Sequence, residues 1–301
     1  MLDPTKPLAP TTQIFLFSYY YCVNLYKFTV IFGVRIMIET LDFGLKDKVA
    51  IVAGGGAVGK DIGNGRAASI LLAEAGAKVL VADKDDALAK NTVQMIRDRG
   101  GEATSISGDL TKSEQCKKVV DFAISKWGRL DILDNNIGIA SKLSVVDEPE
   151  ENWDHVMDIN LKPMFLMSKY AIPEMIKSGN GGSIVNISSI SATRPRGFTT
   201  YSASKGAVLS LSQAMAVDHG ADGIRVNCIL PGPVYTPMVY SSGMTKQHRS
   251  QRQNASLIQM EGDGWDIGKA VVYLSSSWAR YITGHLMVVD GGCSLSSRPR
   301  G

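Results

Sequence analysis

Residues 49–65 read VAIVAGGGAVGKDIGNG, a short apolar run that ends in glycines. Such a run is typical of a strand that is buried on both faces of a parallel sheet. Glycines after the strand permit positive φ and let the backbone approach a pyrophosphate, and the free N–H groups of a following helix would face the phosphates. This stretch therefore predicts a strand–loop–helix unit that binds a dinucleotide.

An acidic residue supports the same interpretation. Asp83 ends the next apolar run and lies 18 residues after Gly65, close to the offset of roughly 20 residues expected for a carboxylate that binds the adenosine ribose. A carboxylate there accepts both ribose hydroxyls and repels a 2′-phosphate, which favours NAD over NADP. Lys60 and Lys84 lie nearby and weaken this preference, so NADP stays an alternative. A solvated charge at a strand end is the other interpretation of Asp83.

The rest of the chain repeats the pattern of strand and helix. Helices are expected over residues 66–75, before Gly76, and from the second strand to about Arg99, and Thr111-Lys112-Ser113-Glu114 reads as a capping box that opens a third. Further strands are expected over residues 78–82, 103–107, 130–133, 183–187, 225–229 and 286–289. Strands separated by helices need crossover connections. We therefore predict one α/β domain, a doubly wound parallel sheet (Rossmann fold) of about seven strands with helices on both faces.

The first 36 residues differ in composition from the rest, since they hold eight of the 22 aromatic residues. The largely apolar residues 14–38 are interrupted by Asn24, Lys27 and Arg35, and a charged residue in mid-span is costly in a membrane. The segment also lacks the features of a signal peptide. Three interpretations remain: a non-native or poorly ordered leader with Met37 as the functional start, a membrane-associated anchor, or a helix packed on the body. We divide the chain into a leader, 1–36, and a Rossmann-fold domain, 37–301.

Composition excludes several classes of protein. With 45% apolar and 20% charged residues, the chain has the composition of a globular protein, and a net charge of +3 is too small to indicate a nucleic-acid surface. The four cysteines form no CxxC pair, and no histidine lies at the offset of a zinc ligand. We therefore expect no metal site, no structural disulfide and a reducing, cytoplasmic location.

Tyr201 and Lys205 lie four residues apart in a stretch of small residues that reads as the start of a helix. Residues at i and i+4 share one helical face. An ammonium beside a phenol favours the phenolate and lowers the phenol pKa, which suits Tyr201 to proton transfer at neutral pH. Taken alone, this spacing is common by chance and also fits a surface tyrosine and lysine.

Six motifs in one order make the pattern specific. They are the glycine loop, Asn135-Asn136-Ile137-Gly138, Asn160, Ser188-Ser189, Tyr201 with Lys205, and Pro231-Gly232-Pro233-Val234-Tyr235-Thr236. Together they resemble the short-chain dehydrogenase/reductase family in its small single-domain form. The resemblance covers about residues 44–293 and includes Asp290-Gly291-Gly292 as a closing motif.

The resemblance implies a role for each residue. Tyr201 would donate or accept the proton of the substrate oxygen, Lys205 would hold the nicotinamide ribose, Ser189 rather than Ser188 would bind the carbonyl oxygen, and Asn160 would organise a water relay to the lysine. Asp109 would lie beside the adenine, and Thr236 would contact the carboxamide. The implied cofactor-binding residues are Gly54, Gly59, Gly63, Gly65, Asp83, Asp109, Leu110, Asn136, Gly138, Tyr201, Lys205, Pro231, Gly232, Val234 and Thr236.

The sequence departs from the family pattern at three places. The family's Gly-x3-Gly-x-Gly spacing occurs at Gly59, Gly63 and Gly65, five residues later than Gly54, where it is expected. Ile137 replaces the usual small residue and would push on the cofactor. Pro163 follows Asn160 closely, and we hypothesise that the kink it causes frees backbone for a bound water.

Evidence on the substrate is limited. Residues 223–260 contain no acid but include Arg225, Lys246, Arg249 and Arg252, which suggests either a basic lid for an anionic substrate or a solvated charged helix. Arg194 and Arg196 would border the pocket, and Met238, Tyr240 and Met244 would form an adaptable apolar wall.

We therefore expect an NAD(P)-dependent oxidoreductase that prefers NAD and interconverts a secondary alcohol and a ketone. A dehydratase or epimerase on the same site and a nucleotide-sensing binding protein are the alternatives. The resemblance also implies a homotetramer that pairs through helices near 153–176 and 201–219, with no nucleic-acid partner and membrane contact only through the leader.

Overall fold

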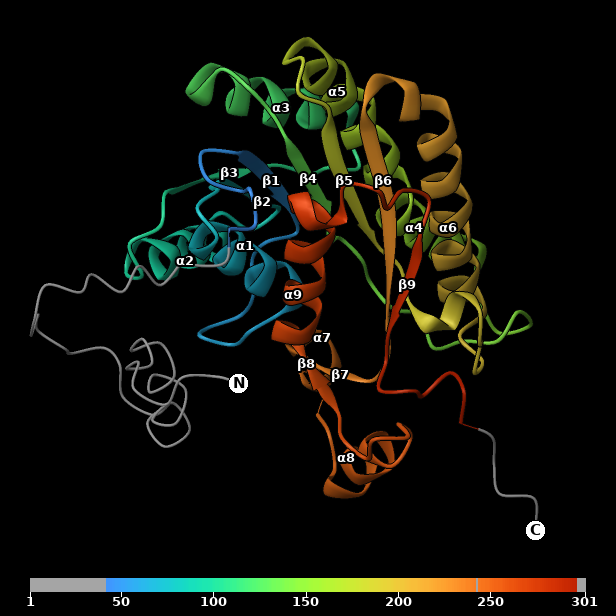
Figure 1. Ribbon diagram of the computed structural model, residues 1–301. Helices are drawn as coiled ribbons and strands as arrows, with labels where there is room; N and C mark the ends of the chain where they lie inside the picture. The colour runs from blue at the N-terminus through green and yellow to red at the C-terminus, as the bar shows by residue number, and fades with distance from the viewer. Residues whose placement is uncertain (1–41, 242, 297–301) are drawn as a thin grey trace, which may run out of the picture. The chain divides into compact units, whose positions relative to one another are not determined.

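Seven parallel strands form the central sheet of the computed structural model, in the order β3-β2-β1-β4-β5-β6-β9 (Figure 1). The structure describes residues 42–241 and 243–296, so the predicted leader and the start at Met37 lie outside the described residues. The strands are β1 (Val49–Ala53), β2 (Lys78–Asp83), β3 (Ala103–Ser107), β4 (Ile132–Asn135), β5 (Gly182–Ile187), β6 (Ile224–Pro231) and β9 (Leu286–Val289). The predicted doubly wound parallel sheet of seven strands is confirmed.

Helices connect successive strands, as parallel pairing requires. They are α1 (Asn64–Glu74), α2 (Asp86–Arg97), α3 (Ser113–Trp127), α4 (Glu150–Asn160), α5 (Lys162–Lys177), α6 (Thr199–His219), α7 (Pro237–Tyr240), α8 (Lys246–Gln253) and α9 (Gly264–Ser275), with short 3₁₀ turns at Ile190–Ala192, Gly220–Asp222 and Ser277–Ala279. A small second sheet pairs β7 (Val234–Tyr235) with β8 (Gly262–Asp263). Among residues 42–241 and 243–296, every helix is too short or too polar to span a bilayer.

Alternate residues of each strand feed two cores, one on each face of the sheet. Ala50 and Val52 of β1 pack in a cluster with α1, α2 and α9, whereas Val49 and Ile51 pack with α3, α5 and α6. Ile51 is completely buried, and full burial of such a side chain contributes roughly 1.5–3 kcal/mol. The continuous apolar run at 49–53 thus reflects burial on both faces.

The predicted capping box at residues 111–114 is wrong, although the helix itself forms. Lys112 is the N-cap of α3, and no side chain caps the helix. The hydroxyl of Thr111 donates instead to Asp109 Oδ1 over 2.8 Å. The Thr111 side chain therefore stabilises the loop after β3 and does not cap α3.

Pro163 marks a complete break between two helices, where the sequence predicted a kink. α4 ends at Asn160, Leu161 has φ −116° and ψ −51°, and Pro163 lies in the first turn of α5. Proline is tolerated at that position because its missing N–H would have no intrahelical partner. The hypothesis of a bound water at this break stays a prediction.

Candidate active site

The loop after β1 packs directly against the start of α1. Gly54 has φ +86°, and a Cβ on Gly65 would lie only 2.1 Å from the carbonyl oxygen of Gly54. Gly63 is the N-cap of α1, in extended conformation. Gly54 and Gly65 therefore make the close loop–helix contact, and Gly63 lies where α1 begins, at the carboxyl edge of the sheet where ligands of open α/β sheets bind.

Gly59 is not part of that contact. It is exposed, has φ +54° and has no atom within 4 Å of its Cβ position. The Gly59–Gly63–Gly65 spacing read from the sequence therefore does not describe the packed turn. Gly54, Gly63 and Gly65 form it, with residues 55–62 as a longer connection.

Arg66 binds the backbone of residues 55–62 from the buried side of this connection. The sequence did not indicate this role. Its side chain is fully buried. Nη1 donates to the carbonyls of Gly59 (2.8 Å) and Asp61 (2.6 Å), and Nη2 to that of Ala57 (2.5 Å). Burial lowers the pKa of Arg66. The available signal was a lone arginine at the start of the otherwise apolar helical run 66–75.

Asp83 lies beside the same loop, at the carboxyl end of β2. Its Oδ2 accepts from the N–H of Gly56 over 2.8 Å, and its Oδ1 from the N–H of Asp85 over 3.1 Å. A Cβ on Gly56 would lie 2.7 Å from that Oδ2. The carboxylate is therefore fixed at the predicted position, whereas Lys60 and Lys84 are exposed.

Asp109 follows β3 and makes a turn with its neighbour. The side-chain hydrogen bond from Thr111 is the main cause that lowers the pKa of Asp109. Leu110 is buried, with 5% of its surface exposed. The aspartate and the leucine thus lie at the same edge of the sheet as Asp83.

The Asn135–Gly138 segment lies between the glycine loop and β5. Asn135 Nδ2 donates to Asn186 Oδ1 over 2.8 Å, and Asn136 Nδ2 donates to Asp134 Oδ2 over 2.8 Å. Ile137 contacts the second core cluster and would meet a Cβ on Gly54 at 3.1 Å. Ile137 therefore packs within the protein, and its predicted effect on a cofactor stays a prediction.

Asp134 was missed by the sequence analysis and lies in the central strand. It is fully buried, and its Oδ1 has no hydrogen-bond partner among the described residues. Burial raises its pKa to about 7, against the hydrogen bond from Asn136. The sequence signal was the second of two acids in the run that reads LDILDNN.

Asn160 joins two parts of the site. Its Oδ1 accepts from the N–H of Ile139 over 2.7 Å, and its Nδ2 donates to Ile139 O and to Ser204 Oγ, each over 2.9 Å. The side chain therefore fixes the backbone after Gly138 to α6. The predicted water relay is not tested by these contacts.

The two serines after β5 have different partners. Ser188 Oγ donates to the carbonyl of Lys205 over 2.7 Å and is thereby committed to the α6 backbone. Ser189 Oγ accepts from the N–H of Ser191 over 3.1 Å, and Ser189 is the side chain that acts to lower the pKa of Tyr201. This geometry favours Ser189 as the serine that faces the tyrosine.

Tyr201 lies in the first turn of α6, and Lys205 follows one turn later. Lys205 is 3% exposed, and its Nζ donates to the carbonyl of Ile187 over 2.8 Å. Burial lowers the pKa of Lys205 to about 8. A Cβ on Gly138 would lie 3.0 Å from that Nζ, so glycine at this position leaves room for the ammonium.

The predicted lowering of the Tyr201 pKa is wrong for this structure. Burial raises the pKa of the phenol, and the hydrogen bond with Ser189 opposes that shift only in part. The Lys205 ammonium is engaged with a backbone carbonyl. The helical spacing places the two residues one turn apart on α6, but it could not indicate how deeply each is buried.

The segment from Pro231 to Thr236 packs against the closing motif. A Cβ on Gly232 would lie 2.4 Å from Cβ of Asp290. Val234 and Thr236 are buried, each 7% exposed, and Thr236 is the N-cap of α7. The implied carboxamide-binding residue thus lies at the carboxyl edge of β6, near the other motifs.

Comparison with known proteins agrees with this geometry. A family model described as "Enoyl-(Acyl carrier protein) reductase" matches residues 56–294. The short chain dehydrogenase/reductase AstE of Aspergillus oryzae is 35% identical over 260 residues, which cover 84% of this chain and 97% of that protein. The chain belongs to the short-chain dehydrogenase/reductase family. This is a family of oxidoreductases.

Two other members of the short-chain dehydrogenase/reductase family extend the comparison. The 2,5-dichloro-2,5-cyclohexadiene-1,4-diol dehydrogenase LinX of Sphingobium indicum is 37% identical over 254 residues, covering 83% of this chain and 98% of that protein. A solved structure of 7α-hydroxysteroid dehydrogenase, complexed with NADH and 7-oxo glycochenodeoxycholic acid, has a TM-score of 0.78 and 34% identity, covering 83% of this chain and 96% of that one.

The described residues of this short-chain dehydrogenase/reductase fit a dinucleotide. Gly54 and Gly65 leave no Cβ where the loop meets α1, and Gly138 leaves none before Lys205. Asp83 presents a fixed carboxylate after β2. These features lie at the carboxyl ends of β1, β2 and β4, the position at which this fold binds dinucleotides.

The predicted basic lid is paired in part with an acid that lies just beyond residues 223–260. Arg252 pairs with Glu261, and Arg249 Nε lies 3.8 Å from the same carboxylate. Arg225 lies on β6 and donates to the Leu274 carbonyl at the end of α9 over 2.8 Å. Glu261 therefore offsets one of the positive charges, Arg225 lies away from the lid, and an anionic substrate stays a prediction.

Arg194 and Arg196 also have partners within the protein. Arg194 donates to the carbonyls of Cys293 and Ser296, and Arg196 Nη2 lies 2.9 Å from Cys293 Sγ. The two arginines thus hold the chain segment that follows β9. Their predicted place at the border of a substrate pocket remains a prediction.

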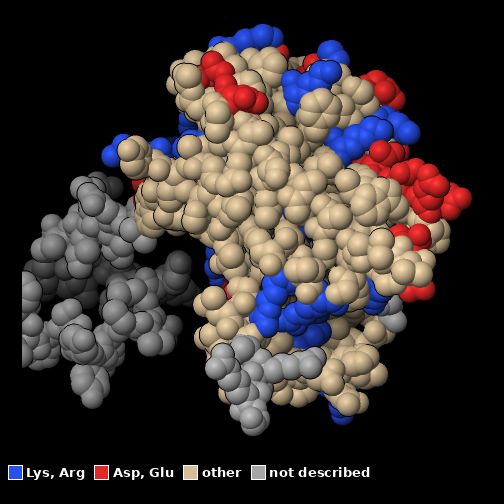
Figure 2. Space-filling model, turned by 90° about the vertical axis from the view of Figure 1, so that its right-hand side faces the viewer, with Lys and Arg blue, Asp and Glu red and all other residues tan. Residues whose placement is uncertain are grey.

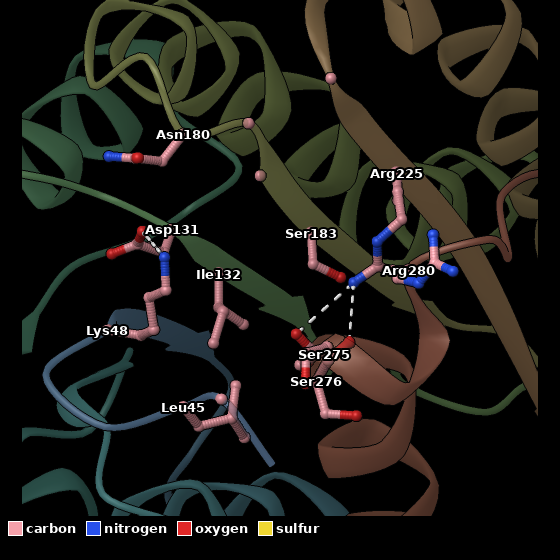
Figure 3. Close-up of a pocket in the computed structure, with 15 residues that line it drawn as sticks. Leu45, Lys48, Asp131, Ile132, Asn180, Ser183, Arg225, Ser275, Ser276 and Arg280 are labelled. Atoms are coloured by element: carbon pink, nitrogen blue, oxygen red, sulfur yellow. Dashed lines mark hydrogen bonds and ion pairs between the residues drawn. The ribbon is translucent and has the colours of Figure 1, made fainter. Parts of the chain in front are cut away.

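A cavity of about 190 Å³ lies at the opposite edge of the sheet, at the amino ends of the strands (Figure 3). Its charged residues are engaged: Lys48 pairs with Asp131 over 3.2 Å, and Arg225 binds carbonyls at the end of α9. The candidate site residues all lie at the other edge. This cavity is therefore not the active site.

Proposed function

We propose that this protein interconverts a secondary alcohol and a ketone with a nicotinamide dinucleotide, and that it prefers NAD to NADP. The observation that carries the proposal is the arrangement of Ser189, Tyr201 and Lys205 beside Gly138. The serine acts to lower the pKa of the tyrosine against the effect of burial, and the lysine lies next to the glycine. The relative that was solved with NADH and a 7-oxo compound supports the same class of reaction.

The cofactor, when bound, supplies or accepts the hydride. We propose that Gly54, Gly63 and Gly65 receive its phosphates and that Asp83 binds the adenosine ribose. The remaining residues implied by the resemblance are proposed to line the same site, namely Asp109, Leu110, Asn136, Gly138, Pro231, Gly232, Val234 and Thr236. Gly59 is left out of the phosphate contact because it lies outside the packed turn.

Tyr201 moves the proton in this scheme. During ketone reduction its hydroxyl donates a proton to the carbonyl oxygen, while Ser189 orients that oxygen by a hydrogen bond. A phenol whose pKa is raised by burial is protonated at neutral pH, so the ligand-free site is prepared to act as the acid. During alcohol oxidation the same oxygen of Tyr201 accepts the proton.

Lys205 and Asn160 support this transfer. Lys205 keeps its positive charge at neutral pH, since its pKa is about 8, and a nearby cation stabilises negative charge on the phenol oxygen. Asn160 fixes the backbone of Ile139 and thereby the position of Gly138. We propose that both residues act by positioning and charge and that a water relay starts near Asn160.

Two further proposals concern the setting of the enzyme. We propose a homotetramer that pairs through α4, α5 and α6. The face of the molecule that carries α6 has few charged side chains in its centre (Figure 2). Phe165 of α5 is 48% exposed, and Val217 of α6 is 83% exposed. We also propose a cytoplasmic location, with residues 37–301 as the catalytic domain.

The proposal is tested by assaying a panel of secondary alcohols with NAD and NADP and of ketones with NADH and NADPH. Turnover that changes the absorbance of the reduced nicotinamide, with a higher kcat/KM for NAD, is the expected result. Product formation without net change in cofactor absorbance would indicate a dehydratase or epimerase. Dinucleotide binding without any turnover across the panel would indicate a sensing protein.

A further inference from the structure

The first turn of α6, which carries Tyr201, has no side-chain cap of its own. Phe198 is the N-cap and has a left-handed backbone, with φ +54° and ψ +54°, and its side chain makes no capping hydrogen bond. The first N–H groups of a helix have no partner within the helix, so they need partners from elsewhere. Residues 139–148, which we call the β4–α4 loop, contact the helix at this point.

The β4–α4 loop holds the start of α6 at two consecutive residues. The carbonyl of Leu143 accepts from the N–H of Thr199 over 3.1 Å. The carboxylate of Glu148 accepts through Oε2 from the hydroxyl of Thr200 over 2.5 Å. Thr200 is fully buried and directly precedes Tyr201. The contact from Glu148 therefore reaches the backbone next to the tyrosine.

Glu148 makes this contact from a fixed position. Its Oε2 also accepts from Ser141 Oγ over 2.7 Å, and its Oε1 accepts from Nδ2 of Asn152 in the first turn of α4. These two donors and Thr200 lower the pKa of Glu148, so the side chain is an ionised acceptor at neutral pH. Hydrogen bonds to a charged acceptor are stronger than those between neutral groups. One carboxylate thus joins the β4–α4 loop, α4 and α6, and the two helices pack against each other (Figure 1).

The opposite end of the β4–α4 loop is also held to α6. Asn160 binds both backbone groups of Ile139 and donates to Ser204 Oγ. The Ser204 hydroxyl in turn donates to the carbonyl of Tyr201 over 2.8 Å. Asn160 and Glu148 therefore fix the two ends of the loop to the turn of α6 that contains Tyr201.

We propose that Glu148 is a positioning residue, which holds Tyr201 where its hydroxyl exchanges a proton with the substrate. This inference rests on the proposed function, which assigns that exchange to Tyr201. Glu148 acts through Thr200 and takes no part in the proton transfer itself. Without the carboxylate, the start of α6 loses its side-chain link to the β4–α4 loop. A displacement of about 1 Å at a reacting group can lower a rate by about 10²-fold, so turnover should depend on this link.

The test compares kcat for a ketone that the panel identifies with the Kd of NADH, in the full-length protein and its variants. Glu148→Ala and Thr200→Val each remove one side of the link, and valine matches threonine in shape. We expect kcat, expressed per NADH-binding site, to fall by about 10- to 100-fold in each. The Kd of NADH should stay near the wild-type value, because the dinucleotide is proposed to be held mainly by Gly54, Gly65 and Asp83.

Conservative variants separate positioning from a general loss of structure. Thr200→Ser keeps the hydroxyl donor and Glu148→Gln keeps an oxygen acceptor, so each should retain more of kcat than Thr200→Val or Glu148→Ala. The double variant that combines Glu148→Ala with Thr200→Val should have the kcat of the slower single variant, because both changes remove the same interaction. The solvent deuterium isotope effect on kcat should rise in Glu148→Ala, because proton transfer from Tyr201 then limits the rate more strongly.

Glu151→Gln is the matched control, since it changes an exposed carboxylate of α4; it should match the wild type in kcat, NADH affinity and isotope effect. A wild-type kcat in Glu148→Ala, or additive losses in the double variant, would overturn the positioning role while the proposed function stands. Should Glu148→Ala fail to fold, equal kcat in Thr200→Ser and Thr200→Val would overturn it in the same way. A wild type without turnover on the whole panel would overturn the proposed function and, with it, the role of Glu148.

Discussion

Replacing Asp134 by Asn should stabilise the protein more at about pH 8 than at about pH 5. Asp134 is fully buried in the middle of the sheet, where its neighbours in register are Val52 of β1 and Val185 of β5. It accepts one hydrogen bond, from Asn136 Nδ2 over 2.8 Å. Burial without a cationic partner raises its pKa from 3.8 to about 7.

The sign of the effect follows from proton binding. Between about pH 4 and pH 7 the unfolded chain has released this proton while the folded protein still holds it, so the stability of the wild type falls as the pH rises. One pKa unit corresponds to about 1.4 kcal/mol, so ionisation of Asp134 lowers the free energy of unfolding by about 2–3 kcal/mol between pH 5 and pH 8. Asp134→Asn removes this titration.

Thermal unfolding of the wild type and of Asp134→Asn at both pH values measures the difference. The Tm of the variant relative to the wild type should rise by about 4–12 °C between pH 5 and pH 8, given roughly 2–4 °C per kcal/mol for a domain of this size. Asp98→Asn, which changes an exposed aspartate, should show no such pH-dependent gap. A gap for Asp134→Asn that is equal at both pH values would refute the reasoning.

Three other predictions follow from the site. Ketone reduction should decline as the pH rises through about 8, where Lys205 loses its charge, and Lys205→Arg should shift that decline to higher pH if the protein still turns over; a pH–rate profile measures both. Ser189→Ala should lower kcat by about 10²-fold or more, whereas Ser188→Ala should keep activity and lose about 1 kcal/mol of stability with its hydrogen bond to the α6 backbone, as steady-state kinetics and urea unfolding will show. Arg66→Met should destabilise the protein by about 2–4 kcal/mol, because buried carbonyls of residues 55–62 lose their donor, and should weaken NADH binding; unchanged urea midpoints would contradict this role.

The strands could be predicted because parallel strands that are buried on both faces leave continuous apolar runs. Val49–Ala53 is such a run, and the structure places it inside the sheet, between β2 and β4. β4 was predicted two residues too early, since Asp134 and Asn135 are polar and do not resemble a buried strand. The β7–β8 pair was missed, because two residues in each strand carry no periodicity.

The sequence predicted which residues form the candidate site. It did not predict how deeply each side chain is buried or which groups it contacts. Motif order indicated that Ser189, Tyr201 and Lys205 meet, and the structure brings the serine to the tyrosine. Spacing along a helix could not reveal that burial raises the pKa of Tyr201 or that Lys205 binds the Ile187 carbonyl. These properties depend on segments that are distant in sequence.

Charge and glycine patterns failed for a similar reason. The stretch 223–260 contains no acid, yet Glu261 neutralises Arg252 from the next position along the chain. The regular spacing of Gly59, Gly63 and Gly65 matched a motif, although Gly54 is the residue that contacts α1. A count of charges or glycines within one stretch cannot include the partners that the tertiary structure brings to each residue from other parts of the chain.

The most direct test of the central claim follows the hydride and the proton donor together. A secondary alcohol that carries deuterium on its carbinol carbon, drawn from those that the panel identifies, is incubated with NAD and either the wild type or Tyr201→Phe. The wild type should transfer deuterium to the reduced nicotinamide, detected by mass spectrometry, and Tyr201→Phe should do so at least about 10²-fold more slowly. Product without deuterium on the cofactor, or an equal rate in Tyr201→Phe, would contradict the account.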